Sequence, residues 1–201
     1  NLAKDFIGVD CIADPVPIQP TAHYSMGGIP ADNDCHVYLD EKGTIVQGFY
    51  AAGECSCISV HGANRLGTNS LLEALVFGRR AGKSLLQDVP QLQLSPVDED
   101  REIAATESEL EELYEGPGTE DLDTIREELK QTMTTQVGVY RDAKDMEPAQ
   151  AKLKELRERF KNVRVGDKGK VFKINLLEAV GLGNMLEFSE LILDGAMERQ
   201  E

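Results

Sequence analysis

A glycine-containing loop that leads into a helix start is the strongest constraint on how this chain of 201 residues can fold. The stretch HGANRLGTNSLLEA, His61 to Ala74, places glycines directly before an apolar run with helical character. A strand is expected just upstream, from Gly48 to Ala52, and it ends at Gly53-Glu54. Strand, loop and helix in this order predict an α/β unit with its ligand at the strand end.

The helix that follows the loop is predicted over Ser70 to Leu86. Asn69 or Ser70 suits the N-cap, and Glu73 occupies the capping-box position for Ser70. A helix start presents unpaired N–H groups and partial positive charge. Arg65, in the loop, adds a planar donor fork that suits a carboxylate or a phosphate. The loop and helix therefore predict an anion site.

A second polar and glycine-rich cluster, PTAHYSMGG, runs from Pro20 to Gly28 and contains His23. By itself a loop arginine is more often structural, and a lone histidine is more often a satisfied structural residue. Together, His23 and Arg65 become candidate donors to a carboxylate. Glu54 is either a surface carboxylate or, at a strand end, an acceptor for the hydroxyls of a nucleotide or polyol.

Elsewhere the sequence predicts a short hairpin and then a helical half. The hairpin has strands at Val37 to Leu39 and Thr44 to Val46. Residues 91–98 read as a linker, and glycines interrupt the helical pattern at 116–118 and 166–169. Leu153, Leu156 and Phe160 form one apolar stripe on an otherwise charged helix. The helices are expected near residues 99–115, 119–141, 147–162 and 175–199.

Charge and hydropathy exclude several classes of protein. The formal net charge is −15, and residues 91–201 hold 15 Lys and Arg against 26 Asp and Glu. Such an acidic surface repels nucleic acid and anionic lipid. The longest apolar runs, such as Leu71 to Phe77, fall far short of the roughly 20 residues that cross a bilayer. We expect a soluble globular protein.

The four cysteines, Cys11, Cys35, Cys55 and Cys57, do not match the spacing of a zinc ribbon, a CxxC redox motif or an iron–sulfur cluster. Reduced, packing thiols are the expectation, with no metal site. Both ends look cut from a longer sequence, because the chain begins with Asn1 rather than Met and stops in helical sequence without a C-cap signal.

Three motifs carry a resemblance to a known family. PTAHYSMGGI (Pro20 to Ile29), GFYAAGE (Gly48 to Glu54) and HGANRLGTNSLLEALVFGRRAG (His61 to Gly82) resemble, in order and spacing, the flavoprotein subunit of succinate dehydrogenase and fumarate reductase. The helical half is similar as well, at TMTTQVGVYR (Thr132 to Arg141) and LLEAVGLGNML (Leu176 to Leu186). The resemblance covers nearly the whole chain.

The resemblance implies FAD as cofactor and a dicarboxylate, succinate or fumarate, as substrate. His23 and Arg65 match positions that clamp a substrate carboxylate, and Glu54 matches one that contacts FAD. Ser70 and Leu71 match the helix start whose backbone lies against the flavin ring, where a helix N-terminus stabilises negative charge. His61 is interpreted as shaping the loop.

The family's catalytic proton-transferring arginine, its N-terminal GxGxxG fingerprint and the histidine that often bears covalent flavin have no match here. The expected fold class is therefore an α+β or α/β fragment. Residues 1–17 would be the end of a capping domain, 18–90 the closing part of a Rossmann-like flavin-binding domain, and 91–201 an all-helical, bundle-like domain.

The resemblance further implies a respiratory role in the tricarboxylic acid cycle and electron transport. An iron–sulfur subunit would take the electrons, and membrane anchor subunits would hold the complex, indirectly, on the cytoplasmic side of the inner membrane. Succinate oxidation is the leading activity. Fumarate reduction and L-aspartate oxidation stay open, as does a non-enzymatic helical interaction module.

Overall fold

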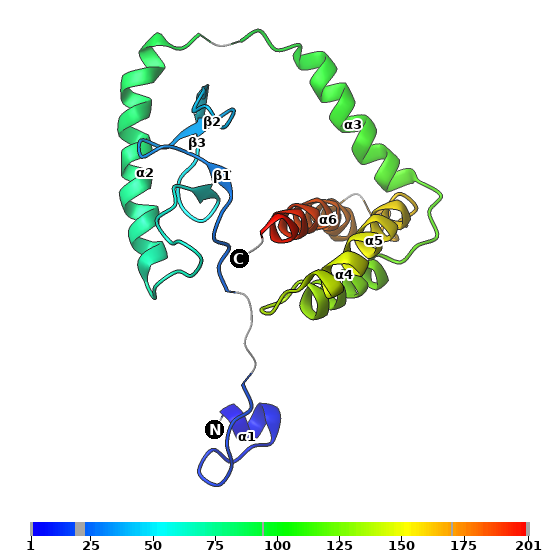
Figure 1. Cartoon of the computed structure of the whole chain (residues 1–201). Helices are drawn as coiled ribbons and strands as arrows, with labels where there is room; N and C mark the ends of the chain where they lie inside the picture. The colour runs from blue at the N-terminus through cyan, green and yellow to red at the C-terminus, as the bar shows by residue number, and fades with distance from the viewer. Residues whose placement is uncertain (1, 19–22, 94, 170, 200–201) are drawn as a thin grey trace. The chain divides into compact units, whose positions relative to one another are not determined.

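The computed structural model describes residues 2–18, 23–93, 95–169 and 171–199. The chain divides into two compact units, Ala22–Pro96, and Val97–Glu201 together with Asn1–Thr21. Each has a separate hydrophobic core. Figure 1 shows strands and one long helix in the first unit, and helices in the second.

The Ala22–Pro96 unit holds two small sheets and one long helix. Strand β1, Ile29–Pro30, pairs in parallel with β4, Ser56–Cys57. Strand β2, His36–Tyr38, pairs antiparallel with β3, Ile45–Tyr50. The predicted hairpin is thereby confirmed, and Asp40 closes its turn by accepting from the N–H groups of Lys42 and Thr44. The separate strand expected at Gly48 to Ala52 is wrong, because β3 runs through Gly48 without a break.

Helix α2, Asn69–Asp88, confirms the predicted helix and covers the small core of this unit. Its Phe77 and Ala81 pack against buried side chains of the strands and their loops, namely Ala31, Cys35, Val37, Ala51 and Ile58. A short 3-10 helix, η1, Val89–Gln91, follows at once. The helix is thus fixed by its apolar face, which leaves its first turn available to the loop that precedes it.

Gly28 permits the close approach of the segment before β1 to the segment before β4. Its φ is 119°, and a Cβ built there would lie 2.5 Å from the carbonyl oxygen of Cys55. The N–H of Ile29 donates to that same oxygen at 2.9 Å. Only glycine fits this position without displacing backbone, so the second glycine of the 20–28 cluster has a structural reason.

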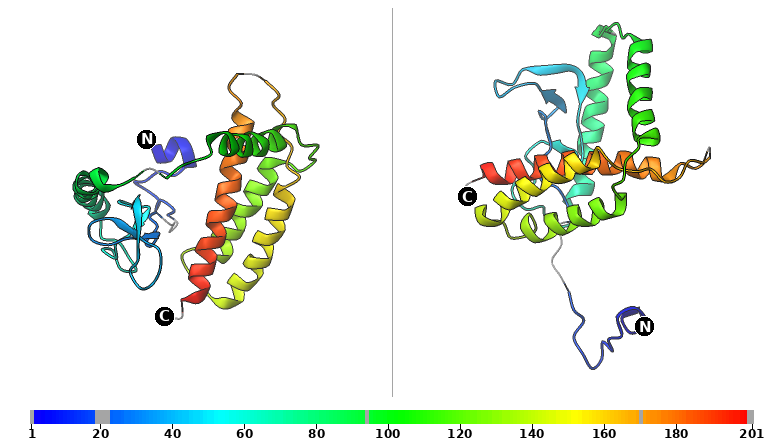
Figure 2. Two further views of the ribbon diagram at one scale, coloured as in Figure 1. Left: turned by 90° about the horizontal axis from the view of Figure 1, so that it is seen from above. Right: turned by 90° about the vertical axis from the view of Figure 1, so that its right-hand side faces the viewer.

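The second unit is built on a bundle of three helices that lie side by side in Figure 2. They are α4, Leu122–Gln136, α5, Ala143–Phe160, and α6, Ile174–Glu198. Helix α3, Glu99–Glu115, contacts α6, and α1, Leu2–Ile7, has no buried residue. The core gathers leucines and isoleucine from all three bundle helices: Ile125, Leu129, Leu153, Leu156, Leu182, Leu186 and Leu193.

The apolar stripe predicted on α5 is confirmed, since Leu153 and Leu156 are buried and Phe160 packs on the core. The two largest differences from the expected helix bounds are the end of α4 and the start of α5. Helix α4 ends at Gln136 rather than near 141, where Arg141 Nε donates back to the carbonyl of Val137. Helix α5 starts at Ala143 rather than 147, because Asp142 caps it through the Asp145 N–H.

Ion pairs join α4 to α5 outside this core. Arg159 donates to Glu128 at 2.7 Å, and Lys152 pairs with the same Glu128 oxygen at 2.7 Å. These two cations lower the pKa of Glu128 to about 2. The link is polar and half-exposed, so packing rather than charge supplies most of the bundle's stability.

The cysteines are free thiols, but they do not share one environment. Cys35 is buried and Cys57 is half-buried, as expected of packing thiols. That expectation is wrong for Cys11 and Cys55, which are exposed because both lie in turns outside the cores. Within the described ranges, none of the helices combines the length and apolar character that a membrane span requires.

Candidate functional site

The first turn of α2 differs from the predicted capping box. The N-cap is Thr68, in the left-handed region at φ 64°, and its side chain makes no capping bond. The expectation that Asn69 or Ser70 caps the helix, with Glu73 returning to Ser70, is therefore wrong. The physical reason is that these side chains have other partners: each of them bonds to a side chain from the preceding loops.

Glu73 is a buried carboxylate at the centre of the site. Its side chain is 2% exposed, and one oxygen, Oε2, accepts from the Tyr24 hydroxyl at 2.6 Å and from His61 Nε2 at 2.7 Å. His61 is 7% exposed and accepts at Nδ1 from the Asn69 amide at 3.2 Å. Because Nδ1 accepts, the proton of the imidazole that faces Glu73 is on Nε2.

Tyr24 joins the buried carboxylate to the candidate arginine. Burial, and then the bond to Glu73, raise the pKa of Tyr24 to about 12, so the phenol stays a hydrogen-bond donor near neutral pH. Its ring lies edge-on to His61 at 5.3 Å and beneath the Arg65 guanidinium, 4.6 Å from ring centroid to Cζ. A cation over an aromatic face is attracted by the ring quadrupole.

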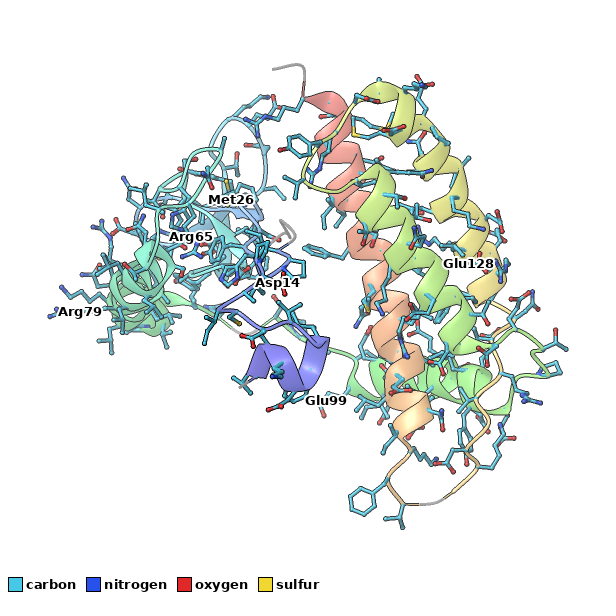
Figure 3. All side chains as sticks on the ribbon, turned by 90° about the horizontal axis from the view of Figure 1, so that it is seen from below. Asp14, Met26, Arg65, Arg79, Glu99 and Glu128 are labelled. Atoms are coloured by element: carbon cyan, nitrogen blue, oxygen red, sulfur yellow. The ribbon has the colours of Figure 1, made fainter. Side chains whose placement is uncertain are left out.

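Arg65 is held on two sides and keeps donors to spare. Its Nη1 donates to Ser70 Oγ at 3.0 Å, in the first turn of α2. Its Nε is buried, yet has no hydrogen-bond partner among the described residues. A buried N–H without a partner costs free energy unless a ligand or further chain satisfies it. Figure 3 labels Arg65 and shows its place in the unit that contains α2.

His23 and Glu54 are linked to the Glu73 network through the backbone on either side of Tyr24. His23 is exposed and directly precedes Tyr24. Glu54, also exposed, accepts at Oε1 from the Ser25 N–H at 3.3 Å. It follows Gly53, whose φ is 83° and whose Cβ position lies 3.9 Å from Ala74 of α2. One short segment, residues 23–25, thus connects both side chains to the site.

The helix start offers backbone donors beside Arg65. Among the described residues, the Ser70 N–H donates no hydrogen bond, while the Leu71 N–H donates to the Thr68 carbonyl at 3.0 Å. Leu71 is 67% exposed. An open N–H, helix partial charge and a guanidinium together form a place that favours an anionic ligand.

Sequence reasoning identified the two loops and missed what joins them. The sequence predicts a capping role for Glu73 and a loop-shaping role for His61, and it indicates no shared network that includes Tyr24 and Asn69. The available signal was spacing, since Asn69 and Glu73 are four residues apart on one helix face. Nothing in the sequence marks Tyr24 as the partner of a glutamate 49 positions away.

Two family models match this chain. One, described as the FAD binding domain, matches residues 1–71, and another, described as the fumarate reductase flavoprotein C-term, matches residues 126–201. The first match spans residues 1–21, which belong to the helical unit, and most of the Ala22–Pro96 unit, while the second lies within the helical unit. They leave residues 72–125, which include most of α2, without a family-model match.

Curated relatives match over the whole chain. Fumarate reductase flavoprotein subunits of a Serratia strain and of Escherichia coli are each 40% identical, and a succinate dehydrogenase flavoprotein subunit of Coxiella burnetii is 37% identical. All of this chain is covered, against 33%, 32% and 35% of those relatives. The chain therefore spans about a third of the length of the curated relatives it matches.

Solved structures agree with this fold. A variant quinol fumarate reductase subunit of Escherichia coli superposes with a TM-score of 0.87 at 40% identity. The Mycobacterium smegmatis Sdh1 complex in the apo form gives a TM-score of 0.86 at 37% identity. Each match covers all of this chain, and 33% and 32% of the respective neighbour. The TM-scores and sequence identities together support the flavoprotein fold for this chain.

Proposed function

We propose that this chain, which belongs to the family of fumarate reductase and succinate dehydrogenase flavoprotein subunits, binds a four-carbon dicarboxylate beside FAD. The activity we propose for the whole protein is oxidation of succinate to fumarate. Fumarate reduction is a second candidate, because the relatives from Serratia and Escherichia coli are named for that direction. The family is an oxidoreductase family whose cofactor is FAD.

The observation that carries the proposal is the setting of Arg65. Its guanidinium is held between the Tyr24 ring and Ser70 Oγ, while its buried Nε proton has no partner in the part of the chain that the structure describes. A carboxylate accepts from two guanidinium donors at once, with better geometry than any single oxygen offers. Arg65 would clamp one substrate carboxylate, and the exposed imidazole of His23, next to Tyr24, would donate to a substrate oxygen.

The residues that this chain would contribute to the cofactor site are chemically suited to FAD. The open Ser70 N–H and the exposed start of α2 at Leu71 suit a ring that gains negative charge. The exposed carboxylate of Glu54 suits hydroxyl groups of the cofactor, and its second oxygen remains available beside the bond to Ser25. When bound, FAD supplies the two-electron chemistry.

The chain's own contribution to the reaction is to bind, orient and polarise. Fixing a dicarboxylate by one carboxylate sets the position of its central carbons, which is a large part of what an active site must do. No residue in 1–201 matches the family's proton-transferring arginine. We therefore assign binding roles to His23 and Arg65, cofactor contacts to Glu54, Ser70 and Leu71, and no catalytic proton transfer to this chain.

The roles of the segments are part of the same proposal. Residues 1–17 would end a capping domain, 18–90 would close the flavin-binding domain, and 91–201 would form the helical domain. The solved neighbours include a complex named as quinol-fumarate reductase with menaquinol. By analogy, an iron–sulfur subunit would receive the electrons, with membrane anchors further along and the flavoprotein peripheral on the cytoplasmic side of the inner membrane.

The test is flavin reduction in the longest native polypeptide that contains this sequence. Its visible spectrum should show bound flavin, and succinate should bleach it anaerobically. Aspartate should not, and a response to aspartate alone would assign the protein to oxidase chemistry. A protein that purifies without flavin would instead support an interaction module. Reoxidation of the reduced flavin by fumarate, compared in rate with dye reduction by succinate, addresses direction.

A further inference from the structure

We propose that Glu73 is a positioning residue for the dicarboxylate site, acting through Tyr24 and His61 on the two segments that carry His23 and Arg65. This inference rests on the proposed function, since it assumes that those two residues bind the substrate. It assigns a role in substrate binding to three side chains beyond those proposed to contact substrate or cofactor.

The geometry makes one carboxylate the shared anchor of both segments. Glu73 Oε2 accepts from Tyr24, the residue next to His23, and from His61, which opens the loop that contains Arg65. The segments lie 49 and 12 residues away from Glu73 in sequence. In the described residues, no other side chain makes hydrogen bonds to both of them.

The first turn of α2 links Glu73 to Arg65. Asn69, Ser70 and Glu73 are spaced by three and four residues, so they share one face of the first turn of α2. Asn69 holds His61, Ser70 receives Arg65 and Glu73 holds Tyr24, whose ring supports the guanidinium. Arg65 is therefore oriented both by the helix directly and by a ring that the helix fixes.

Burial makes the arrangement specific. The Glu73 and His61 side chains are 2% and 7% exposed, so water does not replace a lost partner easily. Removing one member leaves a buried donor or acceptor unsatisfied, and the loops then shift to recover a bond. A displacement of about 1 Å in a group that orients substrate can lower activity by about a hundredfold.

The experiment compares two variants with a control on the same helix. Tyr24→Phe keeps the ring below Arg65 and removes only the hydroxyl that bonds to Glu73. Glu73→Gln keeps the shape and removes the negative charge, so that one neutral amide oxygen has to accept from both donors. The control is Ser84→Ala, also buried on α2, which loses a bond to the Asp34 carbonyl far along the helix from the site.

Steady-state kinetics with succinate, FAD content and malonate titration of the flavin spectrum are measured on the full-length flavoprotein. We expect Tyr24→Phe and Glu73→Gln to raise KM and the malonate Kd by about ten- to hundredfold, with FAD content unchanged and kcat lowered less. The control should keep the wild-type KM and malonate Kd, even though it loses a buried bond.

Two outcomes separate this inference from the proposed function. If the wild type is neither bleached by succinate nor perturbed by malonate, the proposed function is wrong and takes this inference with it. If the wild type responds and both variants keep its KM and malonate Kd, only the positioning role is overturned. Should Glu73→Gln lose FAD or fail to fold, Tyr24→Phe decides, and a wild-type KM in that variant rejects the proposal.

Discussion

Arg65 is the residue on which the proposed chemistry depends most directly. Replacing it by Ala should abolish dicarboxylate turnover while FAD remains bound, because the guanidinium contacts Tyr24 and Ser70 Oγ rather than supporting a core. The loss of a charge-assisted pair corresponds to about 2–4 kcal/mol, or roughly 30- to 1,000-fold in malonate Kd. Malonate titration and flavin absorbance of the same preparation measure both quantities.

Arg65→Lys is the matched control for that experiment. Lysine keeps the positive charge and loses the planar fork, so a large residual defect would show that bidentate geometry matters as well as charge. If Arg65→Ala instead loses flavin and the remaining flavoprotein turns over normally, Arg65 is a cofactor-loop residue and the assignment of a substrate carboxylate to it is wrong.

The backbone geometry at Gly28 leads to a prediction about the stability of a single-residue variant. Gly28→Ala should destabilise the protein more than Gly27→Ala, although both residues have positive φ, at 119° and 107°. Both substitutions carry backbone strain of about 1–3 kcal/mol. At Gly28 the new Cβ would also meet backbone, 2.5 Å from the Cys55 oxygen, while at Gly27 no atom of the described residues lies within 4 Å. Chemical denaturation of the two variants compares them, and equal losses would contradict the steric argument.

At the scale of elements, the hairpin is joined to the end of α2 by a histidine between two carboxylates. His36 Nε2 meets Asp88 at 2.9 Å and Nδ1 meets Asp32 at 3.0 Å, while Tyr50 also donates to Asp88 at 2.7 Å. Asp88 first, and Asp32 after it, raise the pKa of His36, and His36 helps to lower the pKa of both carboxyl groups. The charged imidazole is thus the form that joins strand to helix.

The directions of these pKa shifts define the pH range in which the His36 contact stabilises the fold. A raised histidine pKa stabilises the fold fully below the unfolded value, about 6.5, and the contribution disappears as pH rises through the folded pKa. Lowered aspartate pKa values contribute above the unfolded carboxyl value and are lost as pH falls through the folded ones. Wild type should therefore exceed His36→Gln in stability most at mildly acidic pH, with the difference shrinking above the His36 pKa. Denaturation midpoints of both proteins from pH 5 to 9 measure this, and a constant difference would reject it.

Elements were predictable from sequence wherever a local rule decided them. The hairpin follows from its turn, α2 from its apolar run, and the stripe of Leu153 and Leu156 from helical periodicity. A helix bound failed where the sequence analysis did not identify an N-cap, as with Asp142, which starts α5 at Ala143. The Tyr24–Glu73 contact could not be predicted, because it joins residues 49 apart and depends on how both loops pack.

At the scale of the whole molecule, the two units have separate cores, and only the first holds the candidate site. The site residues span positions 23 to 73, and all of them except Glu73 fall within residues 1–71, which match the FAD binding domain model. In the proposed cofactor site, the chain would supply backbone donors at the start of α2 and the carboxylate of Glu54. No GxGxxG motif, which would cradle the dinucleotide phosphates, occurs in its sequence.

These facts predict that the 201-residue chain, expressed alone, binds FAD weakly. The phosphates carry most of the charge of the cofactor, and the chain, with a net charge of −15, offers them no glycine cradle. Purified chain mixed with FAD should therefore release it on gel filtration, while circular dichroism still shows the helices of the second unit, whose core is independent. The polypeptide that also contains the fingerprint should retain flavin under the same conditions. Stoichiometric flavin on the 201-residue chain would mean that Glu54 and the α2 start suffice for binding, and the division of the cofactor site proposed above would have to be abandoned.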